Sequence, residues 1–507
     1  MRTLYPLALL AAAALAACAP VPAPPAMSPS TEPVADTPAP FAEAAPASPA
    51  ASPAREAPEQ RAARLRAAAI LVDGHSGVPL LVAGGALDLG SSGREVAGAE
   101  LARMKATGVT GELFPIRVGA LPLQGQSLYG GAARRALDLI DATHRQVERH
   151  GAELLLATSA GDLRRAKREG RIAALMGIEG GHAIENSLAA LRSFYRLGVR
   201  YMTLTHTSTN DWADSAGGAL EPAVVRHRGL SPFGEEVVRE MQRIGMLVDV
   251  SHASDATIRA VLKVARAPIL ASSSVAALAH HRIHLADDVL RALAGTGGLV
   301  VVNAWALFLD EAYAEQAGRF LQKHGARLKE LGERYSSDPR RLREEVEKLK
   351  AQEAPIKPPS LSRIADHIDT LVKVAGIDHV GLGADFDGIA APPEGLAGID
   401  GVPSMALELV RRGYSDEDIL KLLGGNFVRV LERAEAYAAS TQTALSGDGS
   451  ARQLTAAELP PQSPEPPAVD LRPRVPPPPP RPSVPASAPP KPAAPPDPGA
   501  LDLIMAR

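Results

Sequence analysis

Short apolar runs alternate with amphipathic segments through the middle of the chain. The stretch from 229 to 252 shows this unit most completely. Its apolar residues first recur at helical spacing, at Val237, Val238, Met241 and Ile244. An apolar, β-branched run then begins at Met246 and ends just before His252. This pattern predicts an amphipathic helix followed by a buried strand, which is the repeating unit of an α/β fold.

Eight apolar runs of this kind predict eight barrel strands. They cover residues 68–73, 112–118, 172–178, 201–205, 247–250, 269–271, 299–302 and 380–383. A ninth run, 153–158, predicts an extra strand beside the barrel. Alternation of strand and helix at this spacing favours parallel pairing. We therefore predict one (β/α)8 TIM-type barrel over residues 63–437.

The segment 309–350 interrupts this alternation after the strand at 299–302. It is rich in Arg, Lys and Glu at helical spacing, which predicts exposed helices with a solvated face. The sequence leaves open whether these helices cover the mouth of the barrel or pair with another subunit.

The two ends of the chain have a different composition from the middle. Residues 1–17 combine one basic residue with a short apolar stretch, which predicts a secretory signal peptide. The sequence Leu-Ala-Ala-Cys at its end resembles the bacterial lipobox and implies lipidation of Cys18, the single cysteine of the chain. Residues 18–62 and 438–507 are rich in proline and predict a disordered tether and a disordered tail.

These features predict a lipid-anchored protein on the periplasmic face of a bacterial cell envelope. Neither Ala19 nor Pro20 is an obvious inner-membrane retention signal, which favours the outer membrane. The tail is interpreted as a spacer, with a docking motif as the alternative.

Charge and hydropathy exclude two classes of protein. A net charge of −3, with acidic and basic residues interspersed, gives no nucleic-acid footprint. Beyond the amino terminus, no run of roughly 18 or more apolar residues indicates a membrane span.

Polar residues follow five of the eight predicted strands. They are His75, Glu179, His206, His252 and Asp385. The carboxyl ends of parallel barrel strands meet at one face, where barrel enzymes place their chemistry. Imidazole and carboxylate are ligands that zinc and similar metals prefer. The set therefore predicts a metal site with acid and base helpers, and a structural cluster is the alternative.

Five stretches closely resemble the membrane (renal) dipeptidase family, peptidase family M19, whose members are amidohydrolase-like. They are GIEGG at 177–181, LTHTSTNDWADS at 204–215, GLSPFGEEVVREMQRIGMLVDVSH at 229–252, DHVGLGADFDG at 378–388 and YSDEDILKLLGGNFVRVLE at 414–432. The resemblance implies a barrel with two zinc ions that hydrolyses dipeptides. It also implies a role for each matching residue: His75 on the first zinc, Glu179 bridging both, His252 on the second, Asp385 transferring the proton and His206 stabilising the oxyanion.

Three family positions are substituted in this chain. Gly77 stands where the family has an aspartate on the first zinc, and a serine, Ser272 or Ser273 by the alignment chosen, stands where it has a histidine on the second. Ile283 replaces the arginine that binds the substrate carboxylate. Nearby residues that could replace them are Arg282, if the loop shifts, and His280, His281 or His284 for the imidazole; solvated loop histidines are the alternative. The remaining His75, Glu179 and His252 also form a set that binds a single zinc in other enzymes.

Two functions of different classes follow. The first is an enzyme that hydrolyses dipeptides or related small amides with one or two zinc ions, at weakened activity or with another substrate preference. The second is an inactive family member that serves as a surface-tethered binding or scaffold protein. The expected partners are a small dipeptide-like substrate and, through Cys18, a membrane; a homodimer is left open.

Overall fold

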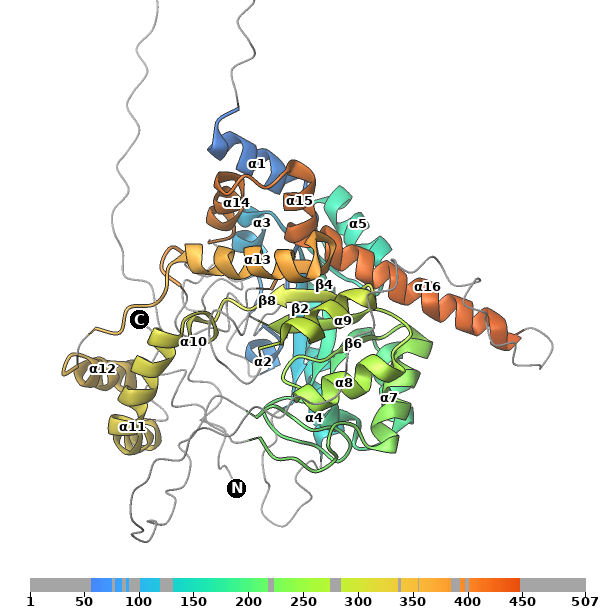
Figure 1. The fold of residues 1–507 in the computed structure, drawn as a ribbon, viewed down its shortest axis with the longest axis horizontal. Coiled ribbons are helices and arrows are strands. Elements are labelled where there is room, and N and C mark those ends of the chain that lie inside the picture. The colour runs from blue at the N-terminus through green and yellow to red at the C-terminus, as the bar shows by residue number, and fades with distance from the viewer. Residues whose placement is uncertain are drawn as a thin grey trace, which may run out of the picture.

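The computed structural model describes residues 56–74, 78–83, 88–90, 101–118, 131–217, 223–273, 284–335, 339–353, 355–383, 393–396 and 401–446. Its strands are β1 (Leu71–Asp73), β2 (Val109–Arg117), β3 (Leu154–Leu156), β4 (Ile172–Glu179), β5 (Val199–Thr203), β6 (Leu247–Asp249), β7 (Ile269–Ser273), β8 (Leu299–Val302) and β9 (Val380–Leu382). Each of the nine predicted strands overlaps one of these. In Figure 1 the labelled strands lie in the middle of the molecule, with helices around them.

All strand pairs are parallel, and the sheet follows the order β1-β2-β4-β5-β6-β7-β8-β9. β3 lies off this path and pairs with residues 172–174 of β4, while β5 pairs with residues 176–179 of the same strand. β2 pairs with the other edge of β4. β3 and β5 therefore pair with the same edge of β4, β3 with its first residues and β5 with its last. The prediction of eight barrel strands and one strand beside them is confirmed.

The barrel closes where β1 and β9 end. Gly74 and Gly383 follow these strands, and a Cβ atom on Gly74 would lie 2.6 Å from the Cα of Gly383. Lower down, Gly424 packs against the same seam, where an added Cβ atom would lie 2.2 Å from the carbonyl oxygen of Ile70. Gly424 also has a φ of 152°, which side chains disfavour. The seam therefore depends on glycines that allow backbone to touch backbone.

Alternate residues of the strands face the inside of the barrel. Buried side chains from β1, β2 and β4 to β8 meet in one cluster, together with helical residues from 160–166 and 427–434. Its strand members include Val72, Leu113, Leu175, Leu247, Leu270 and Leu299. Their sequence neighbours, such as Phe114, Val248 and Val300, belong to a second cluster with the surrounding helices. This period of two is the pattern of a barrel with a packed interior.

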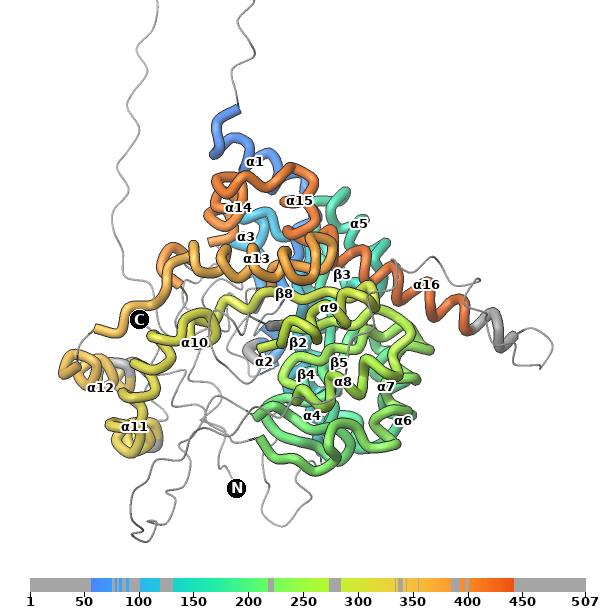
Figure 2. Tube along the Cα trace, viewed as in Figure 1, coloured from blue at the N-terminus to red at the C-terminus, as the bar shows by residue number. Residues whose placement is uncertain are grey.

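The helical segments surround this barrel. They are α1 (Pro58–Ala68), α2 (Val78–Ala83), α3 (Leu101–Thr107), α4 (Ala132–Arg149), α5 (Ala160–Glu169), η1 (Gly181–Ile184), α6 (Leu188–Arg196), α7 (Pro232–Ile244), α8 (Asp255–Val264), α9 (Asp287–Gly295), α10 (Ala306–Leu309), α11 (Glu311–Arg334), α12 (Pro339–Lys350), α13 (Leu361–Ala375), η2 (Ile377–His379), α14 (Val402–Arg411), α15 (Asp416–Leu420), η4 (Lys421–Gly425) and α16 (Asn426–Ser446). Figure 2 traces their path: α1 lies against α14 and α15, and α16 ends away from the barrel.

Helix α7 shows how the sequence sets these boundaries. The Ser231 side chain accepts a hydrogen bond from the Gly234 N–H, and Pro232 takes the first helical position. Gly245 ends the helix with a φ of 86°. The apolar face predicted from the sequence is the buried face of α7. Burial of each large side chain there stabilises the fold by roughly 1.5–3 kcal/mol.

The predicted insertion at 309–350 is helical, as expected, and it has a core of its own. Buried residues of α10, α11 and α12 form a separate cluster that includes Phe308, Phe320, Leu331 and Leu342. Ala216, from the loop between β5 and α7, packs in the same cluster. The insertion therefore rests on a loop of the barrel mouth rather than presenting only a solvated face.

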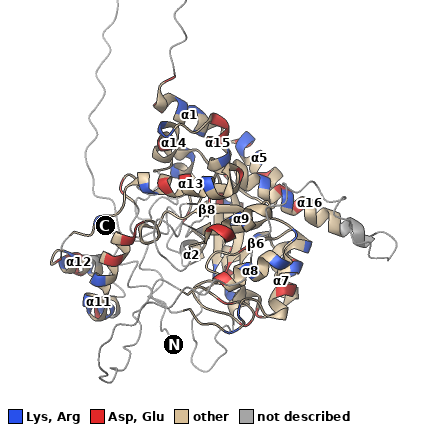
Figure 3. Cartoon of the chain, viewed as in Figure 1, with Lys and Arg blue, Asp and Glu red and all other residues tan. Residues whose placement is uncertain are grey.

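The outer helices carry basic and acidic residues side by side (Figure 3). Examples are the pairs Arg327–Glu330 in α11 and Lys348–Glu345 in α12, both at 2.6 Å. In the described part of the chain, no helix is both long enough and apolar enough to span a bilayer.

Candidate metal centre

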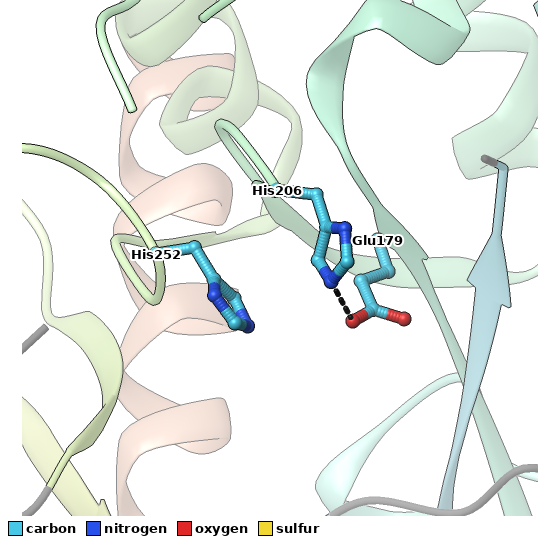
Figure 4. Close-up of side chains that lie close together, drawn as sticks. All are labelled: Glu179, His206 and His252. Carbon is cyan, nitrogen blue, oxygen red and sulfur yellow. Dashed lines mark ion pairs between the residues drawn. The ribbon is translucent and has the colours of Figure 1, made fainter. Parts of the chain in front are cut away.

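Three potential metal ligands meet at the carboxyl ends of β4, β5 and β6. They are Glu179, His206 and His252, and one ligand atom from each lies within 4.8 Å of the others. Figure 4 shows the two imidazoles and the carboxylate directed toward one another from three neighbouring strand ends. Parallel pairing explains this convergence, because adjacent strands end at the same level of the barrel.

Glu179 is the last residue of β4 and continues the inward-facing series of that strand. Two positions earlier stands Gly177, where an added Cβ atom would lie 2.0 Å from the ring of Tyr201. Glu179 as a whole is only 5% exposed. Its Oε1 lies 3.1 Å from His206 Nε2, and its Oε2 lies 3.5 Å from Arg117 Nε. A buried carboxylate between two nitrogen groups keeps its charge at lower cost than an isolated one.

His206 follows β5 and is held through its backbone. The Ser215 hydroxyl donates to the His206 carbonyl oxygen. The Nε2 atom of His206 is 3.1 Å from Glu179 Oε1 and 3.4 Å from Arg117 Nη2. One ring nitrogen can donate to the carboxylate or accept from the guanidinium, but not both. The shorter contact favours donation to Glu179.

His252 has an unusual backbone conformation for a non-glycine residue. Its φ is 61°, in the left-handed region. The Ala216 N–H donates to its carbonyl oxygen at 2.9 Å. The Ser215 hydroxyl lies 3.2 Å from the same oxygen and shares its single proton between it and the His206 carbonyl oxygen. The same loop thus fixes both histidines. Strain of this kind persists where surrounding contacts enforce it and is concentrated at functional sites.

A buried carboxyl group lies beneath the cluster. Asp249, the last residue of β6, accepts hydrogen bonds from the Thr203 hydroxyl at 2.7 Å and from the backbone N–H of Ser251 at 2.9 Å, as well as from the Ser251 hydroxyl. The Ser272 N–H then donates to Ser251 Oγ at 2.6 Å. Burial raises the pKa of Asp249, against the opposing effect of these hydrogen bonds. The network connects the ends of β5, β6 and β7.

His182 lies in η1, directly after β4. Its Nε2–H donates to the carbonyl oxygen of Val118, which follows β2, at 2.6 Å. Burial lowers the pKa of His182 from 6.5 to about 4, so the ring is neutral at neutral pH. We therefore assign His182 a structural role: its hydrogen bond joins the end of β2 to the segment that follows β4.

A model of the family described as membrane dipeptidase (peptidase family M19) matches residues 59–445. The chain belongs to this family. Dipeptidase aclJ of Aspergillus oryzae is 35% identical over 344 residues, which cover 64% of this chain and 71% of the relative. Dipeptidase verJ of Clonostachys rogersoniana is 35% identical over 303 residues, which cover 60% of this chain and 66% of the relative.

The fold agrees with the family assignment. The crystal structure of the probable dipeptidase PvdM from Pseudomonas aeruginosa is similar to this chain, with a TM-score of 0.62 and 25% identity. The match covers 75% of this chain and 99% of that one. The resemblance inferred from the five sequence stretches is confirmed, as is the (β/α)8 fold that it implied.

The metal on which this family depends fits the residues that the structure brings together. One carboxylate and two imidazoles are donors that zinc accepts, and three protein ligands with an open position are typical of catalytic zinc. Glu179, His206 and His252 would hold such an ion. Family membership and this cluster together support a metallodipeptidase.

The structure describes only part of the predicted site. It brings Glu179, His206 and His252 together, whereas the resemblance assigned His206 to the oxyanion. Ser272 contributes its backbone N–H to the Asp249 network, and Ser273 is the last residue of β7. Predicted positions outside the described residues are Cys18, His75, Gly77, Ile283 and Asp385.

Sequence reasoning missed Arg117. This residue ends β2, directly opposite Glu179 in the register of β2 and β4. In the structure Arg117 is a polar residue at the end of a strand, which is the feature shared by the other candidates. It was overlooked because arginine is not a metal ligand and the predicted strand continued to residue 118.

Proposed function

We propose that this protein is a metal-dependent hydrolase that cleaves the amide bond of dipeptide-like substrates. We further propose that it is less active than family members with the full ligand set. The convergence of Glu179, His206 and His252 at the barrel mouth carries the proposal. Family membership and the names of the two dipeptidase relatives support the choice of substrate class.

A divalent cation bound there would polarise the substrate carbonyl and lower the pKa of a bound water. The chain's own residues prepare the site for that chemistry. The Ser215 hydroxyl fixes the backbone at both histidines, so the two rings are positioned before a substrate arrives. The Asp249 network fixes the strand ends beneath them. Positioning before binding avoids an ordering cost during the reaction.

His206 has two alternative roles, and we assign it to the metal donor set because its Nε2 atom lies among the other ligand atoms. Replacement by alanine distinguishes the two roles. Loss of a metal ligand would weaken zinc affinity, whereas loss of an oxyanion donor would lower kcat and leave zinc affinity unchanged.

The proposal is tested by metal analysis of purified protein together with turnover of a panel of dipeptides. We expect zinc in the purified protein and measurable hydrolysis that increases when Zn²⁺, Mn²⁺ or Co²⁺ is added. Zinc below ~0.2 per chain, with no turnover after any of these additions, would contradict it.

The alternative function is a catalytically inactive binding or scaffold protein. The observation in its favour is the loss of donor side chains at Gly77 and at Ser272 or Ser273. The double substitution Gly77→Asp with Ser273→His returns one donor to each place. A parent protein without metal, combined with a double variant that binds it, would support this function. A parent that is already metallated excludes it.

We also propose that the protein is anchored to the membrane of a bacterial cell envelope through lipidated Cys18, with the outer membrane favoured. The lone cysteine after Leu-Ala-Ala supports this proposal. Labelling with a fatty-acid analogue and membrane fractionation test it. Cys18→Ser should abolish labelling and release the protein from the membrane fraction; a labelled Cys18→Ser variant would contradict the assignment.

A further inference from the structure

Arg117 stands beside the metal centre because of the sheet register. It is paired with Glu179 across β2 and β4, and both residues continue the inward-facing series of their strands. The guanidinium reaches two members of the cluster: its Nε lies 3.5 Å from Glu179 Oε2, and its Nη2 lies 3.4 Å from His206 Nε2. The positively charged guanidinium therefore lies beside the side chains that could bind a metal cation.

The two oxygens of Glu179 have different surroundings. Oε1 faces His206, an imidazole that can itself bind a metal, whereas Oε2 faces the guanidinium of Arg117. A carboxylate that bridges two ions uses one oxygen for each. An arginine side chain stays protonated at any ordinary pH and repels a cation placed against the same oxygen. The negative charge at Oε2 of Glu179 is thus already balanced by the guanidinium of Arg117.

The donor set agrees with this asymmetry. Among the described residues, the cluster offers one carboxylate and two imidazoles, which suit one ion with an open coordination position. Arg117 is also half exposed, with 50% of its side chain accessible against 6% for Glu179. The Nε and Nη2 edge of the guanidinium therefore lies against the cluster, while half of the side chain remains accessible.

We propose that the site binds a single divalent cation and that Arg117 supplies the second positive charge. The ion binds on the His206 and His252 side of Glu179, and the guanidinium pairs with the opposite carboxylate oxygen. This inference rests on the metal site of the proposed function and adds the metal count and the residue that sets it. It differs from the two zinc ions implied by the family resemblance.

The test uses the full-length protein stripped of metal with a chelator and titrated with Co²⁺, whose visible absorption reports binding. Bound zinc is counted separately after saturation with Zn²⁺ and gel filtration. We expect one equivalent in the parent protein. Arg117→Lys keeps the charge and should also bind one. Arg117→Gln removes it and should either bind a second equivalent or hold the single ion at least tenfold more tightly.

A matched control is Arg239→Gln in α7. Arg239 is another half-exposed arginine; it pairs with Glu235 at 2.6 Å and is not a member of the cluster. The variant should bind metal as the parent does. Circular dichroism and thermal unfolding establish that each variant is folded, and Arg117→Lys keeps the test valid if Arg117→Gln does not fold.

Two outcomes would overturn the inference: two equivalents in the parent protein, or an Arg117→Gln variant identical to the parent in both count and affinity. Its failure is distinguishable from failure of the proposed function. Two bound ions with dipeptide turnover overturn only the inference. One bound ion without turnover, together with the expected response of Arg117→Gln, overturns only the function. No bound metal after saturation overturns both.

Discussion

The ends of β4, β5 and β6 differ from the strand ends on either side of them. The central three present Glu179, His206 and His252, each a metal donor and each held by hydrogen bonds or ion pairs from its neighbours. The flanking strands β2 and β7 end in Arg117 and in Ser272 and Ser273. Both regions share one continuous parallel sheet. One sheet therefore carries potential metal donors at its central strand ends and an arginine and two serines at the strand ends beside them.

The fold and the chemistry of the strand ends depend on different residues. Strand pairing depends on backbone hydrogen bonds and on apolar residues inside and outside the barrel, which resist change. A side chain at a strand end faces the mouth and can be replaced with little effect on packing. Loss of a ligand can thus occur without loss of the fold, and the two regions can be tested separately.

The largest effect is expected at Glu179, in the donor region formed by Glu179, His206 and His252. Glu179→Gln keeps the volume of the side chain but removes its charge, so metal affinity and hydrolysis should both fall, hydrolysis by about 10³-fold. Metal analysis and turnover measure the two effects. Glu185→Gln, in the exposed segment that follows η1, is the matched control and should behave as the parent does. Unchanged metal binding in Glu179→Gln would remove the basis for the donor region.

A pH effect is expected at His182, which joins the two regions through Val118. The folded-state pKa of about 4 lies below the unfolded value near 6.5. Protonation therefore favours the unfolded state, and the stabilising contribution present above pH 6.5 is lost as pH falls toward 4. The loss amounts to about 3 kcal/mol.

Denaturant unfolding at pH 7, 5.5 and 4.5 measures this contribution. His182→Gln can still donate to the Val118 carbonyl oxygen but does not titrate, so its stability should fall less over this interval. Equal pH dependence in the parent and the variant would show that carboxyl groups elsewhere account for the whole effect.

A smaller effect is expected in the network beneath the donors. Ser251→Ala removes one donor to Asp249 and the acceptor of the Ser272 N–H. We expect a loss of about 1–3 kcal/mol in the free energy of unfolding and a decrease in metal affinity of roughly tenfold. Calorimetry and metal titration measure them. A destabilised variant with unchanged metal affinity would show that the network supports the fold without positioning the site.

The smallest effect is expected at Ser272, in the flanking strand β7. The hydrogen bond from Ser272 to Ser251 uses the backbone N–H, which alanine retains. Ser272→Ala should therefore change the free energy of unfolding by less than about 0.5 kcal/mol and leave metal content unchanged. A marked loss of metal in Ser272→Ala would show that this serine contributes to the metal site, at one of the two positions where the family resemblance implies a histidine.

Much of the fold was predictable because its signals are local. The α7 unit has a serine cap, a proline, an apolar face and a terminal glycine, all visible in the sequence. Strand positions were correct within a few residues, and the extra strand at 154–156 was recognised from its apolar run. The separate core of α10 to α12 was not predicted, because packing of Phe308 and Phe320 against Ala216 joins residues far apart in the chain.

The site was predicted in part for the same reason. Glu179 and His252 were found because both end predicted strands, and the structure places them together. Roles were harder to assign than positions. His206 lies against Glu179 at 3.1 Å, a contact that depends on the level at which two strands end and on the loop that holds Ser215.

The sequence by itself determined the barrel, its family and the residues that end the central strands, because apolar periodicity and local motifs specify strands and their order. Only the tertiary structure decided which charges meet at the mouth. The register that sets Arg117 opposite Glu179 joins positions 62 residues apart, whose side chains lie 3.5 Å from each other. Register is a property of the assembled sheet, and the electrostatic character of the site follows from it.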